Sequence, residues 1–350
     1  MSRGPSSLET GTPSGPLRLG IAGCGDIAAY AALLTRLNRK IHLAACCDRD
    51  LDTARRFAAR HRISQAFGDY SEMLSRANLE AVYLAVPHDL HLPLAQEALE
   101  RGLPVLCEKP LARTLDEGRQ MVSLAAKSGG KLGVNYQYRY DSGCFALAEA
   151  ARRGELGELF YARCNIPWRR EAEYMTKSGG WHSSLERSGG GTLLTQGSHF
   201  LDILLWAMGS PAVAASGETA RRRLRQSEVE DLALGTLVLE SGAYIQVCSS
   251  MIAARERPAT IELYGSQATA LYRDGLRPRL RFEGARIRPA RPPARGPHAL
   301  ARSLEAFRRW VQLGEPYLTP AVEALPVLTA VEAIYRSAAS GQKERISLET

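Results

Sequence analysis

The sequence has no apolar run that could cross a membrane and no cysteine pattern typical of an exported or metal-binding protein. Its longest apolar runs fall far short of the roughly 20 residues that a membrane-spanning helix needs. The seven cysteines include no CxxC pair, and the adjacent Cys46 and Cys47 should point to opposite faces of a strand. We therefore expect no contact with a membrane, no bound metal and a reducing, cytoplasmic location.

The chain also has no internal repeat and no apolar core of a signal peptide. Residues 1–16 are rich in Gly, Pro, Ser and Thr and are predicted to form a disordered tail. A length of 350 residues, with 45% hydrophobic and 23% charged residues, indicates two globular domains. The net charge of +8 is spread along the chain apart from residues 221–225 and 277–295, which we interpret as solvated loops rather than a nucleic-acid surface.

The first part of the chain alternates short apolar runs with longer segments of helical period, which is typical of parallel strands joined by crossover helices. The expected strands are 17–22, 41–47, 81–86, 103–108 and 131–136, and the expected helices are 26–37, 51–61, 91–101 and 114–128. Thr114 and Glu117 form a capping box at the start of the last of these helices. The pattern predicts an α/β, doubly wound parallel sheet over residues 17–137.

The remaining residues, 138–350, are predicted to form a second domain with a mostly antiparallel sheet. A helix (142–153) and a strand (157–166) precede a Trp- and Gly-rich loop and a second helix (197–208). Strands 229–240 and 244–251 read as one hairpin, and strands 259–265 and 268–273 as another. Helices 298–313 and 319–339 close the chain, and the last could return to the first domain.

A glycine-rich turn follows the first strand. It is a GxGxxA motif that opens a helix, Gly23-Cys24-Gly25-Asp26-Ile27-Ala28. Gly23 permits the tight turn, and Gly25 leaves room for a pyrophosphate to approach the positive end of the helix dipole. Asp48 ends the second strand, where an acid is needed to bond the adenosine ribose hydroxyls. The motif therefore predicts a dinucleotide-binding Rossmann domain; a turn that binds nothing would explain the glycines but not the acid.

The acid also bears on the choice of cofactor. The carboxylate of Asp48 favours NAD over NADP because it repels a 2′-phosphate. Arg49 follows immediately and could pair with that phosphate, so NADP stays possible.

Two further segments, Ala85 to His91 and Cys107 to Pro110, end parallel strands at the edge where ligands of such a sheet gather. In the second segment, Lys109 would project into the crevice, where it can polarise a substrate hydroxyl or carbonyl. A helix-starting loop and a solvated turn are the plain structural alternatives.

Taken in order, the segments GIAGCGDIA, AVPHDLH, CEKPLA, SGGGTLLTQGSHFLD, VED and AIYRSAASG resemble the Gfo/Idh/MocA family of oxidoreductases over about residues 17 to 345. The resemblance implies a Rossmann domain and an α/β domain with a large open sheet that often serves oligomer contacts. It implies that Lys109 is the catalytic or substrate-orienting lysine and that His199 transfers the proton. Pro87, His91 and Glu108 are the further residues that we expect around the cofactor.

The chain departs from the family pattern at two places in this site. Relatives that oxidise polyols typically carry Asp four residues before the histidine, where this chain has Thr195, and they often show Trp-Arg where it has Trp181-His182. Thr195, Trp181, His182 and Arg169 are the substrate candidates, and core packing is the alternative for the tryptophans. Asn135 and Arg139 are lesser candidates. Asp202 could face the substrate, although holding a neighbouring loop is its simpler role.

These residues predict an NAD(P)-dependent oxidoreductase that transfers hydride between nicotinamide and a secondary alcohol or ketone of a sugar, cyclitol or sugar-containing metabolite. Two alternatives stay open: a glycosidase of the same fold that uses NAD transiently, and a dinucleotide-bound sensor without catalysis. We expect a homo-oligomer that associates through the second sheet.

Overall fold

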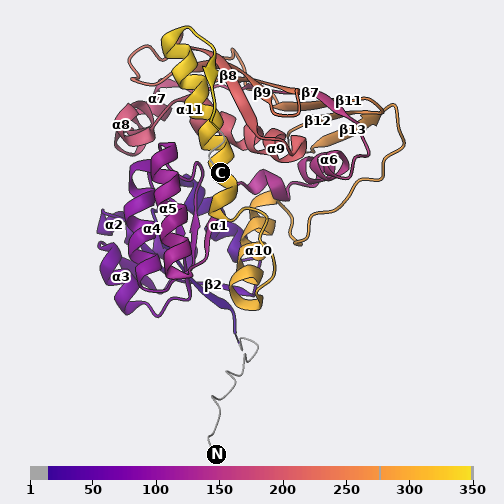
Figure 1. Cartoon of the computed structure of the whole chain (residues 1–350). Coiled ribbons are helices and arrows are strands. Elements are labelled where there is room, and N and C mark those ends of the chain that lie inside the picture. Colours follow the sequence, from indigo (N-terminus) through magenta and orange to yellow (C-terminus); the bar gives the residue numbers. More distant parts are fainter. Residues whose placement is uncertain (1–14, 276, 348–350) are drawn as a thin grey trace, which may run out of the picture.

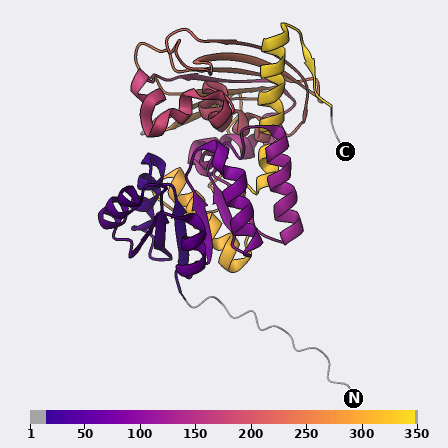
Figure 2. The same ribbon diagram turned by 90° about the vertical axis from the view of Figure 1, so that its left-hand side faces the viewer.

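The computed structural model describes residues 15–275 and 277–347 (Figure 1). The predicted disordered tail, residues 1–16, lies outside the described residues except for Gly15 and Pro16. The parallel sheet fills the lower part of the molecule and the larger sheet the upper part, as both views show (Figures 1 and 2).

The first sheet has six parallel strands in the order β3-β2-β1-β4-β5-β6. They are β1 (Leu17–Ala22), β2 (Ile41–Cys47), β3 (Gln65–Phe67), β4 (Ala81–Leu84), β5 (Val105–Cys107) and β6 (Leu132–Val134). The crossover helices are α1 (Asp26–Thr35), α2 (Leu51–His61), α3 (Tyr70–Arg76), α4 (His91–Glu100) and α5 (Leu115–Ser128). Cys46 and Cys47 belong to separate core clusters, which confirms that they point to opposite faces. The order reverses between β1 and β4, and the segments predicted to bind ligand all follow the strand ends at this edge.

The second sheet has eight strands in the order β13-β12-β11-β7-β10-β9-β8-β14. They are β7 (Leu159–Pro167), β8 (Ala212–Ala220), β9 (Leu232–Leu239), β10 (Tyr244–Ser250), β11 (Thr260–Gly265), β12 (Thr269–Arg273), β13 (Arg279–Glu283) and β14 (Glu344–Arg345). Both predicted hairpins are present, and only β7 and β10 pair in parallel among the neighbours described. The α/β fold class is thus confirmed.

Helices cover the side of this sheet that faces the first one (Figures 1 and 2). They include α6 (Ser142–Arg152), α9 (Ser198–Met208) and α11 (Leu325–Ser340), with the short α7 (Ala172–Thr176) and α8 (Leu185–Ser188) at one end. Helix α10 (Ala299–Leu313) instead packs with β1, since Leu300, Leu304 and Phe307 share a core cluster with Leu19. The chain therefore returns to the parallel sheet late in the sequence, and the division at residue 137 stays a prediction.

Several elements were not predicted from the sequence. Strand β3 has three residues, too few for a visible period, and α3 follows it directly. Strand β8 is built largely from small residues, and β13 alternates arginine with apolar residues inside the segment interpreted as a solvated loop. The start of the predicted helix 197–208 is preceded by a π-helical turn, Leu193–Gly197.

Candidate active site

The glycine-rich turn has the shape that a pyrophosphate requires. Gly23 has a φ of 87°, and a β-carbon there would lie 2.1 Å from the carbonyl oxygen of Ala85. At Gly25 a β-carbon would meet nothing within 4 Å, so the space beside the turn is open. The carboxylate of Asp48 accepts a hydrogen bond from the backbone N–H of Cys24 at 3.1 Å. The acid thus lies directly beside the turn, as a group that binds ribose hydroxyls must.

Helix α1 begins at this turn without a side-chain cap. Its N-cap is Gly25, whereas the side chains of Asp50, Asp69, Thr114 and Asp141 cap α2, α3, α5 and α6. The first N–H groups of a helix need acceptors, and the helix dipole favours an anion there. The open space, the uncapped helix and the adjacent acid together fit the pyrophosphate and ribose of a dinucleotide.

Lys109 follows β5 and reaches across to the π-helical turn of the second part of the chain. Its ammonium donates a hydrogen bond to the main-chain carbonyl of Thr195 at 2.5 Å. Burial lowers the pKa of Lys109 to about 8, with Glu108 opposing this shift and Arg170 adding to it. A π-helical turn is frequent at functional sites, and here it presents a carbonyl to a cation.

His199 lies one turn further along, in the first turn of α9. It is 7% exposed, and the rings of Tyr138 and Tyr136 lie edge-on to it with centroids 5.1 and 6.4 Å away. Within the described residues, its Nδ1 has no hydrogen-bond partner. Burial, with a smaller contribution from the charge of Lys109, lowers the pKa of His199 well below its usual range. The structure thus brings a cationic lysine and a neutral histidine together.

The hydroxyl of Thr195 is engaged within its own helix. It lies 2.6 Å from the carbonyl oxygen of Gly191, to which it donates, and 2.8 Å from the side-chain oxygen of Gln196. The main-chain carbonyl of Thr195, rather than its side chain, therefore contacts the lysine, which the sequence did not indicate.

Glu108 lies in an internal hydrogen-bond network. Its carboxylate accepts from the hydroxyl of Tyr83, from the amide of Asn135 at 2.6 Å and from the backbone N–H of Lys109 at 3.2 Å. Ser303 of α10 donates to the other side of Asn135 at 2.8 Å. These contacts fix the orientation of the loop that carries the lysine.

His91, predicted to border the cofactor ring, is fully buried among carbonyls. Its Nδ1 lies 3.0 Å from the carbonyl oxygen of Pro110, and its Nε2 lies 3.1 Å from that of Val86. It therefore joins the loop after β4 to the lysine loop. Pro87 starts the short 3-10 turn His88–Leu90 between β4 and α4.

The loop after β7 brings an aromatic group next to these residues. Trp181 stacks on His182 with centroids 3.8 Å apart and meets the ring of His88 edge-on at 4.7 Å. His182 also packs on Tyr174 at 4.2 Å. Burial, followed by the charges of Lys109 and Lys177, lowers the pKa of His182 to about 4.

Arg169 is placed differently from its neighbour Arg170. Arg169 pairs with Glu171 and donates to a carbonyl of the loop after β10. The guanidinium of Arg170 lies 5.3 and 5.6 Å from the rings of Trp168 and Tyr174, and its charge reaches Lys109. Arg170 is therefore the arginine nearer the centre.

The same loop also reaches the glycine-rich turn. Lys177 forms an ion pair with Asp26 of the GxGxxA motif. A β-carbon at Gly179 would lie 3.2 Å from the guanidinium of Arg49. Residues 177–179 thus contact both the glycine-rich turn and the residue after Asp48, and these contacts could not be predicted from the sequence.

Arg139 and Asp202 form a buried ion pair away from solvent. The guanidinium lies 2.7 Å from the carboxylate, whose side chain is 0% exposed, and it also reaches Glu323 at 2.9 Å. Asp202 therefore holds a neighbouring loop, its simpler expected role, and the side chain of Arg139 is already engaged.

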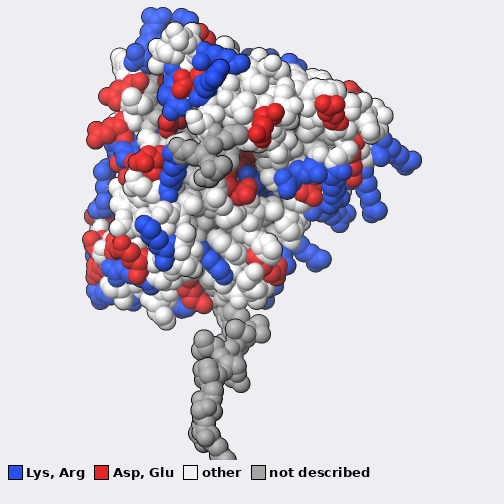
Figure 3. All heavy atoms as spheres, in the orientation of Figure 1, with Lys and Arg blue, Asp and Glu red and all other residues white. Residues whose placement is uncertain are grey.

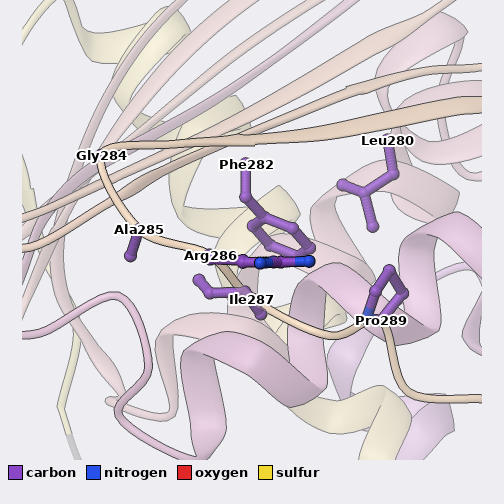
Figure 4. Close-up of a pocket in the computed structure, with 7 residues that line it drawn as sticks. All are labelled: Leu280, Phe282, Gly284, Ala285, Arg286, Ile287 and Pro289. Carbon is purple, nitrogen blue, oxygen red and sulfur yellow. The ribbon is translucent and has the colours of Figure 1, made fainter.

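Other features of the described residues lie apart from this centre. A surface hollow of about 620 Å³ lies at β13, where Phe282, Arg286 and Ile287 sit side by side (Figure 4), and it includes no predicted site residue. Over residues 15–275 and 277–347, no group of three or more His, Cys, Asp or Glu is arranged to hold a metal. In the same residues no helix has the length and apolar character needed to cross a membrane.

The fold and this arrangement define a dinucleotide-dependent oxidoreductase. The model of the oxidoreductase family with an NAD-binding Rossmann fold, GFO_IDH_MocA, matches residues 17–136, and the GFO/IDH/MocA C-terminal domain model matches residues 145–271. The chain belongs to the GFO/IDH/MocA family.

Relatives and solved structures agree with this assignment. The chain is 26% identical to D-glucoside 3-dehydrogenase of Escherichia coli, over 96% of this chain and 99% of the relative. It is 25% identical to D-xylose 1-dehydrogenase (NADP(+)) 2 of Haloferax volcanii, over 93% of this chain and 98% of the relative. The WlbA dehydrogenase of Bordetella pertussis, solved in complex with NADH and UDP-GlcNAcA, superposes with a TM-score of 0.82 at 26% identity, covering 95% of this chain and all of that one.

Replacing Lys177 with alanine should weaken NADH binding. The charge of Asp26 would then face the dinucleotide phosphates without a counter-ion, and we expect the Kd to rise about two- to five-fold because the pair is exposed. Fluorescence titration measures the effect. The double variant K177A/D26N should recover the affinity; unchanged binding by K177A alone would contradict this role.

Proposed function

We propose that the enzyme uses NAD to oxidise, or NADH to reduce, a secondary alcohol or ketone of a sugar, cyclitol or sugar-containing metabolite. One observation carries this proposal: the ammonium of Lys109 binds the carbonyl of Thr195, one helical turn before the buried and neutral His199, beside the edge of the parallel sheet that fits a dinucleotide. The nicotinamide supplies hydride transfer to or from carbon.

The two central residues have complementary roles. In oxidation, the imidazole of His199 takes the hydroxyl proton while the ammonium of Lys109 donates a hydrogen bond to the same oxygen. As the C–H bond gives up a hydride, the carbon–oxygen bond becomes double and the proton stays on the histidine. In reduction, the same proton returns to the oxygen. Both residues act on one oxygen, so proton and hydride movements are coupled.

Surrounding residues bind the two ligands in this proposal. The turn from Gly23 to Ile27 holds the pyrophosphate, and Asp48 holds the ribose and favours NAD. Arg49 keeps NADP possible. Pro87, His91 and Glu108 shape the nicotinamide end, the last two by fixing the lysine loop.

Substrate contacts come from the aromatic loop. Trp181 and His182 line the substrate position, and Arg169 lies at its outer margin. Thr195 contributes its main-chain carbonyl, which holds the ammonium of Lys109. We further propose a cytoplasmic enzyme, in keeping with its seven free cysteines.

The outward face of the second sheet supports a homo-oligomer. Tyr244, Tyr161 and Tyr264 stand at one register position of β10, β7 and β11. Tyr244 and Leu234 are 49% and 45% exposed on this face. Pairing it with a second copy would bury these apolar surfaces.

Replacing Lys109 or His199 with alanine should abolish sugar oxidation and leave NADH binding unchanged. Each loss removes one of the two groups on the reacting oxygen, and we expect kcat to fall at least about 100-fold. Steady-state rates with a panel of sugars and cyclitols, together with calorimetric titration of NADH, measure both effects.

The same assay separates the open alternatives. Net NADH formation with a polyol contradicts the glycosidase as the main activity, and tight NADH binding without turnover across the panel would favour the sensor. Full activity of either alanine variant would refute the assigned roles.

The rate of oxidation should depend on pH through the protonation of Lys109 and of His199. Above about pH 8, Lys109 loses its proton and kcat/KM should fall, since its pKa is lowered to about 8. On the acid side the fall should begin only below the usual range of histidine, because the pKa of His199 is lowered by burial. NADH affinity over the same range serves as the control; a profile that stays level to about pH 10 would exclude the lysine role.

Tyr244→Asp should reduce the molar mass seen by light scattering to that of the monomer. A carboxylate on the outward face would have to be buried without a partner if two sheets paired. Leu37→Asp, at a residue that is 72% exposed beside the first sheet, is the matched control and should leave the mass unchanged. A monomeric wild type would overturn the proposed oligomer.

A further inference from the structure

Three loops join into one assembly, which we name the canopy: residues 168–188, 221–228 and 252–257. The first of them contains Arg170 and His182, which interact with the charge of Lys109. The first and second are joined by the ion pair of Glu171 with Arg223 and by the hydrogen bond from Glu228 N to Ser183 O at 2.9 Å. Met175, Leu224 and Met251 form a small apolar cluster at their junction with β10. The loops are therefore parts of one packed unit.

The canopy has a large excess of positive charge. Its three segments contain ten Lys or Arg residues and five Glu residues. Glu171 is shared between two arginines, and Glu256 pairs with Arg170. Arg225 donates instead to a main-chain carbonyl, which carries no charge. Lys177 and Arg187 pair with Asp26 and Asp89 outside the canopy, which reduces the excess from five positive charges to three, still of the sign that attracts anions.

The carboxylates that contact the canopy from the side of the parallel sheet are already paired: Asp26 with Lys177, and Asp89 with Arg187. The ammonium of Lys109 is held by a neutral carbonyl, and the side chain at position 195 is a threonine. Glu108 already accepts hydrogen bonds from Tyr83, Asn135 and a backbone N–H. A neutral polyol would gain little from so many cationic groups, whereas an anionic substituent would be stabilised by them.

We propose that the sugar substrate carries an anionic group, a carboxylate or a phosphate, which the canopy attracts and Arg170 helps to hold. This inference rests on the proposed function and narrows its substrate class. Arg170 suits the role because its guanidinium lies over Trp168 and Tyr174, and Tyr174 reaches Gln196 of the π-helical turn at 3.3 Å.

The chain offers an internal control for this proposal. A second group of arginines lies along β13 and the linker after it, and Figure 3 shows basic side chains gathered there, on the opposite side of this view from α7 and α8. Arg279 and Arg288 are both exposed in this group. Reversing the charge of two of these arginines changes the net charge of the protein as much as reversing two arginines of the canopy. The change then lies away from the canopy.

The test compares matched pairs of substrates with the full-length enzyme: D-glucose with D-glucuronate, D-glucose with D-glucose 1-phosphate, and UDP-GlcNAc with UDP-GlcNAcA. We expect kcat/KM for one or more anionic members to exceed that of the neutral partner at least about ten-fold in low salt. The difference should shrink as salt rises. The glucuronate and phosphate arms identify which anion is recognised.

Three variants complete the experiment. R170Q should raise the ratio of KM for the anionic substrate to KM for the neutral one about ten-fold, and R222E/R225E should act in the same direction. R279E/R288E should leave KM for both the anionic and the neutral substrate unchanged. Retained NADH affinity shows that each variant is folded.

Turnover of neutral and anionic partners at equal kcat/KM would overturn the inference while the proposed function stands. Equal effects of the canopy and β13 reversals would overturn it too. If no member of any pair is turned over although NADH binds, the proposed function itself fails.

Discussion

The hydrogen bond from the Lys109 ammonium to the carbonyl of Thr195 joins the parallel sheet to the helix that carries His199. An ammonium removed from water needs an acceptor, and a hydrogen bond to a charged group contributes about 1.5–3 kcal/mol. An ordinary α-helix uses its interior carbonyls for its own N–H groups. The π-helical turn at Leu193–Gly197 departs from that pattern at the point where the lysine arrives. The relative positions of Lys109 and His199 thus depend on a local irregularity of one helix.

Two buried carboxylates hold the two sides of this contact. Glu108 fixes the lysine loop through Tyr83 and Asn135. Glu230 accepts from the backbone N–H groups of Gly191 and Leu193 at 2.8 and 2.9 Å and so fixes the entry to the π-helical turn. Gly191 is required there because a β-carbon would lie 1.9 Å from the carbonyl oxygen of Glu230. Both acids act on loops, and neither is free to serve the substrate.

The parallel sheet, its glycine-rich turn and most helices could be predicted from the sequence because each leaves a local periodic signal. The N-cap at Thr114 is confirmed, since its hydroxyl accepts a hydrogen bond from the backbone N–H of Glu117, whose carboxylate accepts in turn from the N–H of Arg113. Contacts between distant segments left no such signal: Lys177 with Asp26, Lys109 with the carbonyl of Thr195, and Arg170 with Tyr174. Strand β13 was missed although its residues alternate, because its arginines were interpreted as solvated. The sequence shows where the basic residues lie along the chain. It could not show that three loops far apart in the sequence bring many of them together.

Several buried carboxylates are engaged in structural contacts, and this affects the electrostatics around Lys109 and His199. Asp202 is paired with Arg139, and Asp231 accepts backbone N–H groups of the loop after β8. In addition to burial, the charge of Lys109 lowers the pKa of His182 and of His199, and Asp26 opposes this shift at His182. A carboxylate beside His199 would do the opposite and favour its protonated form. Burial and the charge of Lys109 leave His199 neutral and so able to accept a proton at neutral pH, while Glu108 offsets part of the lysine charge. The neutral state of His199 and the proposed preference for an anionic substrate therefore both depend on the charge of Lys109.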